Sequence, residues 1–153
     1  MRSAIATIVV LTLVVASSVS QAQHPDDPFS RVPSSRRTQL KSRLNEFVSY
    51  HVSKDWGHVY DLLSDRYKVD QAITTKEVFL EKRLYSQLKR FTPAYAYKLK
   101  DEWWWVRGCA NFDGREAIDS LVEAHYTNHN WYFSDFSRFP MGCIECEELQ
   151  CKP

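Results

Sequence analysis

The sequence predicts an α+β domain in which helices from the first half of the chain pack on one side of an antiparallel sheet. Three observations lead to this class. Apolar residues recur at helical spacing in the first half of the chain, side chains alternate as in strands in the second half, and two turn signals divide that second half into hairpins. A run of helices followed by a run of strands is typical of helices segregated to one face of an antiparallel sheet.

Residues 1–22 have the pattern of a secretory signal peptide. Arg2 supplies a basic start, the apolar run after it is too short to be a good membrane span, and small residues stand at Ser20 and Ala22. We therefore predict a secreted or periplasmic protein that starts at Gln23. The alternative is an uncleaved N-terminal anchor.

The charge balance excludes one class of partner. Loss of Arg2 with the signal leaves one basic residue fewer than the 20 of the whole chain, against 19 acidic residues. A nucleic-acid-binding protein is expected to show a basic excess or stripe, so we expect no nucleic acid. No later stretch is long and apolar enough to cross a bilayer, so no membrane contact is expected after signal cleavage.

Two helices follow a proline-containing lead-in. Residues 23–37 carry three prolines among polar residues and are expected to be flexible. Apolar stripes with helical spacing then predict a first helix over about 38–52 and a second over about 56–63. His51 and His58 lie on or beside these helices and are interpreted as core-edge or surface residues rather than ligands.

A third helix and a first strand come next. The third helix is expected to start near Thr75 and to end before Pro93. Residues 94–100 then alternate, with Tyr95 and Tyr97 on one side, as in a strand with one buried face.

The sheet is centred on residues 103–136, which hold four of the five tryptophans and two turn signals, Asp113-Gly114 and Asn128-His129-Asn130. Asp-Gly favours a two-residue hairpin loop. Such a loop would place Phe112 opposite Arg115, and the rest of the register would follow from it. A helix is the alternative for residues just after this loop, because they also fit a 3.6-residue period.

This register divides the side chains between two faces, since successive strand residues point to opposite sides. One face mixes apolar and charged side chains and is expected to be half exposed or to contact a partner. The other face is mostly apolar and is expected to be concave; it carries Trp103, Trp105, Arg107, Cys109, Ile118, Ser120 and Val122.

The chain resembles the nuclear-transport-factor-2-like superfamily, also called SnoaL-like, over about residues 40–136. The resemblance rests on the helix from Lys54-Asp55-Trp56 to Leu63 and on a long final hairpin that ends Asn130-Trp131-Tyr132-Phe133. It implies a domain over 38–137 in which a curved sheet wraps over helices and encloses a pocket, and often a dimer. Some members are isomerases, dehydratases or hydrolases and many only bind ligands or partners, so no catalytic residue is carried over.

Arg107 is the most unusual residue of the predicted concave face. A guanidinium among tryptophans and opposite Ser120 must be paired, because desolvating an isolated charge is prohibitive. One interpretation is an internal ion pair with a helix acid such as Asp61 or Asp65. The other is that Arg107 binds a carboxylate or phosphate of a ligand through two hydrogen bonds.

Asp101 is the one weak candidate for a catalytic residue. In an uninterrupted strand it would point to the same side as Tyr95, Tyr97 and Trp103. Desolvation there would raise its pKa and suit it to act as a general base beside a tyrosine hydroxyl. A bulge in the charged stretch around it would instead turn Asp101 to solvent.

The four cysteines, Cys109, Cys143, Cys146 and Cys151, are expected to form two disulfides. The expected arrangement is a tail, residues 138–153, that is cross-linked to itself and joined to the sheet through Cys109. A zinc site and a redox-active CxxC motif are the alternatives.

The sequence as a whole predicts an exported, non-catalytic binding module with a small-molecule pocket inside the cone. We expect no metal and no cofactor; the expected partners are a small apolar or anionic ligand and a second copy bound through the sheet. The alternative is a cofactor-free isomerase, dehydratase or hydrolase that uses Asp101 and a pocket tyrosine. The predicted ligand-binding residues are Tyr95, Tyr97, Trp103, Trp105, Arg107 and Ser120.

Overall fold

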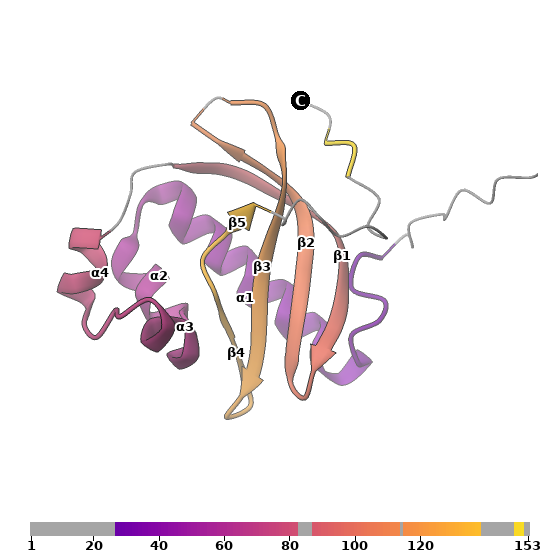
Figure 1. The fold of residues 1–153 in the computed structure, drawn as a ribbon. Helices are drawn as coiled ribbons and strands as arrows, with labels where there is room; N and C mark the ends of the chain where they lie inside the picture. Colours follow the sequence, from indigo (N-terminus) through magenta and orange to yellow (C-terminus); the bar gives the residue numbers. More distant parts are fainter. Residues whose placement is uncertain (1–26, 83–86, 114, 139–148, 152–153) are drawn as a thin grey trace, which may run out of the picture.

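A computed structural model describes residues 27–82, 87–113, 115–138 and 149–151. Its helices are α1 (Ser34–Ser53), α2 (Trp56–Leu62), α3 (Asp65–Asp70) and α4 (Lys76–Lys82), and its strands are β1 (Leu88–Lys100), β2 (Trp103–Phe112), β3 (Ile118–Thr127), β4 (Asn130–Phe133) and β5 (Ser137–Arg138). The strands form one antiparallel sheet in the order β1-β2-β3-β4, and β5 pairs with β3. The predicted α+β class is therefore confirmed (Figure 1).

Helix α1 covers one face of the sheet, which we call the inner face (Figure 1). It begins at Ser34, four residues before the predicted start, and ends at Ser53, followed by the cap residue Lys54, whose φ of 60° is left-handed. Its buried residues are spaced by three and four positions, so they lie on one stripe of the helix. They are Leu40, Leu44, Phe47 and His51, and the three apolar ones belong to one core with the buried inner-face residues Val106, Ala110, Val122, Ala124, Trp131 and Phe133.

Residues 27–33, just before α1, pack against the domain, which differs from the flexible lead-in predicted for 23–37; residues 23–26 lie outside the described residues. Phe29 and Val32 are only 4% and 1% exposed and belong to the core. The backbone N–H of Ala96 in β1 donates to the carbonyl of Pro28 at 2.7 Å. Prolines and polar residues suggested disorder, but two apolar side chains are enough to attach residues 27–33 to the edge of the sheet.

The predicted third helix is too long. α4 ends at Lys82, and Leu88 is already the first residue of β1. Pro93 lies inside β1 rather than at a helix end, beside a register shift between Pro93 and Tyr95. Proline is tolerated there because β1 is an edge strand, where a missing N–H need not break the ladder. The short helix α3 was not predicted.

The predicted register between β2 and β3 is wrong by one residue. Arg107 pairs with Leu121 rather than with Ser120, and β3 begins only at Ile118. Asp113 does not close a two-residue loop, because its N–H donates to the carbonyl of Gln87 at 2.9 Å and its carboxylate accepts from the N–H of Gln87 at 2.8 Å. A slip of one residue moves every β2 side chain to the opposite face.

The second turn signal is confirmed, and the structure shows that its loop has two residues. Asn128 and His129 have φ values of 49° and 59°, and Thr127 pairs with Asn130 across the loop. Asparagine adopts positive φ more readily than most residues, which is why this signal marked the turn. Residues 118–127 are a strand, so the alternative helix after Gly114 is excluded for them.

Candidate binding surface on the outer face of the sheet

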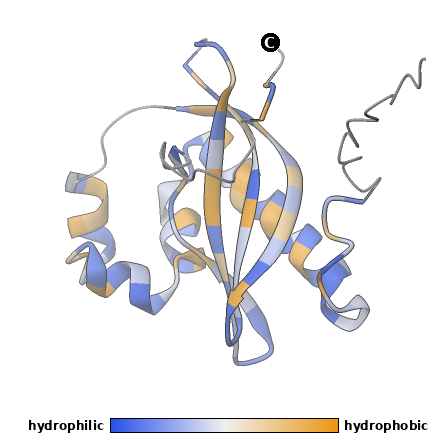
Figure 2. Cartoon of the chain, turned by 45° about the vertical axis from the view of Figure 1, so that its right-hand side comes forward, coloured by the Kyte–Doolittle hydropathy of each residue, from blue (hydrophilic) through white to orange (hydrophobic). Residues whose placement is uncertain are grey.

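The face of the sheet opposite α1, which we call the outer face, collects the side chains that the sequence singled out. Hydrophobic and hydrophilic residues alternate along the strands (Figure 2), so each strand contributes every second residue to this face. The pairing of Tyr95 with Arg107 and of Tyr97 with Trp105 aligns β1 with β2. The outer face comprises Tyr95, Tyr97, Trp103, Trp105, Arg107, Cys109, Asp119, Leu121, Glu123 and His125.

Five of the six predicted ligand-binding residues lie together on this face, but not inside a cone. Ser120 is the exception, because it is 0% exposed on the inner face and its hydroxyl donates to the carbonyl of Ile118 at 3.2 Å. The prediction that Trp103, Trp105 and Arg107 face inward is wrong. It followed from the two-residue loop at Asp113-Gly114, which set β2 one residue out of register.

Arg107 is buried and paired, but with a strand acid rather than a helix acid. Its guanidinium is 2% exposed. Nε donates to both carboxylate oxygens of Asp119, at 2.8 and 3.0 Å, and Nη2 contacts the same carboxylate. Nη1 donates to the hydroxyl of Tyr95. Hydrogen bonding to Asp119 raises the pKa of Arg107 despite the opposing effect of burial.

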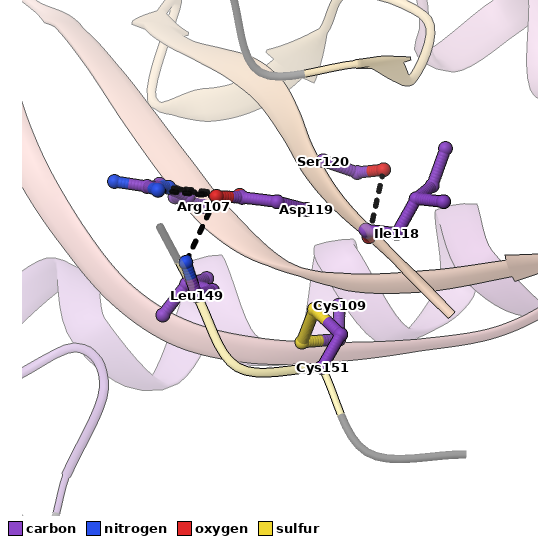
Figure 3. The surroundings of a disulfide bond; sticks show 7 residues. All are labelled: Arg107, Cys109, Ile118, Asp119, Ser120, Leu149 and Cys151. Carbon is purple, nitrogen blue, oxygen red and sulfur yellow. Dashed lines mark hydrogen bonds and ion pairs between the residues drawn. A yellow bond between two sulfur atoms is a disulfide. The ribbon is translucent and has the colours of Figure 1, made fainter. Parts of the chain in front are cut away.

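The pairing bears on both interpretations of Arg107. The expected helix partners are engaged elsewhere, Asp61 with Lys76 at 2.8 Å and Asp65 with Lys68 at 3.9 Å. The guanidinium binds a carboxylate of the protein itself, so its geometry favours the internal ion pair over the binding of a ligand anion. Arg107 therefore organises the outer face by joining β2 to β3 through Asp119 (Figure 3) and to β1 through Tyr95.

The aromatic part of the outer face lies next to this ion pair. The rings of Tyr95 and Tyr97 are 5.6 Å apart, and Tyr97 meets Trp105 edge-to-face at 5.5 Å. The indole N–H of Trp105 donates to Glu123 at 3.2 Å. These four side chains are partly exposed. Burial raises the pKa of Tyr97 to about 12, so its hydroxyl stays protonated and can donate at neutral pH.

Trp103 forms a second aromatic contact at the end of the same face. Its ring stacks on His125 with 4.0 Å between centroids and 3° between planes. The guanidinium of Arg66, from α3, lies 5.2 Å from the Trp103 ring, which is a favourable cation–π distance. Burial lowers the pKa of His125, so the neutral imidazole is favoured in the fold.

The stacked His125 predicts a loss of stability in mild acid. The unfolded chain takes up this proton near the ordinary histidine pKa of about 6.5, whereas the folded chain takes it up only at lower pH. The stabilisation by neutral His125 is therefore complete above that pH and decreases as the pH falls toward the folded pKa. Chemical denaturation between about pH 7 and pH 5 should show a smaller pH dependence for His125→Gln than for the wild type. The exposed His129→Gln serves as control; equal slopes for all three proteins would contradict the assignment.

Asp101 lies in the turn between β1 and β2, exposed and with a φ of 44°. The prediction that it points into a cavity is wrong. The register shift between Lys98 and Lys100 breaks the alternation just before it, as the charged sequence allowed. The proposed acid–base chemistry thus lacks the buried carboxylate on which it depended.

The cysteines confirm one part of the predicted framework. Cys109 and Cys151 form a disulfide with their Cα atoms 5.5 Å apart. Cys143 and Cys146 lie outside the described residues, so their disulfide stays a prediction. Among the residues that the structure describes, no group of three or more His, Cys, Asp or Glu side chains is arranged to hold a metal ion.

The sequence placed Asp119, Leu121, Glu123 and His125 together on the mixed face, which was expected to be half exposed or to contact a partner, and they do share one side of β3. It did not place them on the same face as Trp103, Trp105 and Arg107. Only the correct register shows that this side adjoins Arg107 and Trp105.

In comparisons with known proteins, no family model, no curated protein and no solved structure matches the chain. Over the described ranges, none of the helices is both long and apolar enough to span a membrane.

Proposed function

We propose that this protein is an exported, non-catalytic binding module of the nuclear-transport-factor-2-like type that binds its partner on the outer face of the sheet. The observation that carries the proposal is the gathering of Tyr95, Tyr97, Trp103 and Trp105, all partly exposed, on a sheet face opposite the helix that fills the inner face. Tyrosine, tryptophan and arginine are the residue types enriched at the centres of protein interfaces.

The partner that we propose is a second copy of the chain. An isologous contact brings a surface against itself, so charged groups within it must find opposite charges on the same surface. The outer face offers such a pair, because Glu123 lies on it and Arg66 reaches it from α3. The resemblance to a superfamily with many dimers agrees with this choice.

Export is part of the same proposal. The signal-like residues 1–22 lie outside the described residues. The Cys109–Cys151 disulfide supports export, since disulfides persist mainly in oxidising compartments.

Native mass spectrometry of protein purified from its own host tests the proposal. We expect a dimer at micromolar concentration, built from chains that begin at Gln23 and carry two disulfides. Tyr97→Lys should give monomers, because it places an uncompensated charge within the aromatic patch. The matched control is Val69→Lys, which replaces an apolar residue of α3 that is 77% exposed. A wild-type protein that stays monomeric would reject a second copy as the partner.

One observation supports a second candidate, a small ligand inside the cone. Trp131 is 0% exposed, and its indole Nε1 has no hydrogen-bond acceptor among the described residues. A buried indole N–H normally has a partner, which a ligand or a water molecule could supply. The same native spectra decide this point: a retained mass that Trp131→Phe abolishes supports a ligand, and a bare chain mass argues against one.

A further inference from the structure

A short segment, Leu149–Cys151, is held against the outer face, and we call it the strap. A disulfide from Cys151 to Cys109 of β2 joins it to the sheet. Its backbone also binds the sheet, because the N–H of Leu149 donates to Oδ2 of Asp119 at 3.2 Å. Figure 3 shows the strap passing from beside Asp119 to Cys109.

The strap lies on the ion pair that organises the outer face. Oδ2 of Asp119 accepts from both Leu149 and Arg107. Side chains of the pair are only 2% and 11% exposed, although they point away from the inner face that α1 covers. By contrast, Tyr97 and Trp105 on the same face are partly exposed. The outer face therefore has an open aromatic part and a part closed over the ion pair.

We propose that the strap is a redox-controlled cover of the outer face, an inference that rests on the proposed function because it assigns the regulation of that surface. With the disulfide formed, Arg107 and Asp119 are covered and the surface offered to a partner is aromatic. With the disulfide reduced, the hydrogen bond from Leu149 to Asp119 is too weak to hold the strap by itself, and the strap moves away from the sheet. The surface then extends from Tyr97 and Trp105 to the ion pair.

The reaction that opens the strap is a thiol–disulfide exchange with a dithiol reductant. One reductant thiolate attacks a sulfur of the Cys109–Cys151 bond, forms a mixed disulfide and releases the other cysteine as a thiol. The second reductant thiol then displaces the remaining cysteine. Two electrons and two protons pass to the protein, and the reductant leaves as its own disulfide.

Arginine labelling tests the cover without any ligand. In a Cys143→Ser/Cys146→Ser variant only Cys109 and Cys151 remain of the four cysteines, so their bond is the only disulfide that the chain can form. Phenylglyoxal, which modifies accessible guanidinium groups, is applied to the oxidised and the dithiothreitol-reduced protein, and peptide mapping gives the rate at each arginine. On reduction we expect the rate at Arg107 to rise by about tenfold or more, as local exposure replaces rare opening. The rate at Arg90, which is exposed on β1, should not change.

A second variant and a check of the fold separate opening of the strap from unfolding of the protein. Leu149→Pro keeps the disulfide but removes the N–H that binds Asp119, and it should raise the Arg107 rate by less than reduction does. Circular dichroism monitors the fold. An unchanged Arg107 rate after reduction would overturn the proposal, and so would a rise at Arg107 and Arg90 together with loss of the folded spectrum, since the disulfide would then be a structural link.

The labelling is carried out at a concentration where native spectra show monomers, so its result does not depend on self-association. A strap that opens in a protein that never dimerises would leave the redox inference standing and reject the second copy as partner. A protein that dimerises but shows the same Arg107 labelling rate before and after reduction would support the second copy as partner and reject the redox-controlled strap.

Discussion

Replacing Arg107 with methionine is expected to destabilise the fold by about 3–5 kcal/mol, because removing one partner of a buried ion pair strands the other charge. Asp119, whose side chain is 11% exposed, would lose the guanidinium that binds both of its oxygens. The Tyr95 hydroxyl would lose the same partner. Urea denaturation of the oxidised protein measures the change.

The double variant Arg107→Met/Asp119→Leu separates the value of the pair from the penalty of breaking it. We expect it to recover much of the lost stability, since two apolar side chains leave no stranded charge. Arg90→Met, at an exposed position of β1, is the control and should stay within about 0.5 kcal/mol of the wild type. A loss below about 1 kcal/mol for Arg107→Met would be the behaviour of a surface pair and would contradict the buried arrangement.

Gly108→Ala is expected to destabilise the protein by about 3 kcal/mol or more, or to prevent folding. A Cβ atom at Gly108 would lie 2.3 Å from the carbonyl oxygen of Thr92, 2.8 Å from Cα of Pro93 and 2.9 Å from Cζ of Phe91. Two of these atoms belong to the β1 backbone, which pairs with β2 at this position. Relief of the clash would therefore separate the two strands.

Gly57→Ala is the matched control for this substitution. Gly57 lies in α2, and the nearest atom to an added Cβ is Asp55 Oδ1 at 3.7 Å, an ordinary contact. Because alanine favours helix, the variant should be unchanged or more stable by up to about 1 kcal/mol. Thermal unfolding followed by circular dichroism compares the two variants, and equal melting temperatures would show that β1 does not pack on Gly108 as described.

Much of the fold follows from local patterns in the sequence. The spacing of the apolar residues in α1 predicts a helix with one buried side, because residues three and four positions apart share a helix face. The loop at Asn128-His129 was predictable because asparagine accepts the positive φ that a two-residue hairpin needs. The choice of Cys109 as the link between tail and sheet also followed from the sequence, and the Cys109–Cys151 bond confirms it.

The composition of the candidate surface was predictable, but its location was not. Tyr95 and Tyr97 share a face of β1, and Trp103, Trp105 and Arg107 share a face of β2, because side chains two apart on a regular strand point to the same side. The pairing of β1 with β2 puts both sets on one face of the sheet. The alignment of β2 with β3 decides whether this face is the inner or the outer one. The observed alignment differs by one residue from the one that a two-residue loop would give, and one residue is enough to exchange the two faces of β2.

Only tertiary contacts decided that step. Asp113 exchanges hydrogen bonds with Gln87, which is distant in sequence and just precedes β1, so the loop after β2 is longer than Asp-Gly alone indicates. Tertiary contacts also fix the segment before α1. Phe29 and Val32 are buried in the core, although the polar residues and prolines around them in the sequence predicted a flexible segment. By itself the sequence therefore determined α1, α2, the hairpin order and the residues of the aromatic patch. The tertiary structure decided that the patch lies on the outer face and that Arg107 pairs with Asp119, because both depend on a register set by residues far apart in the chain.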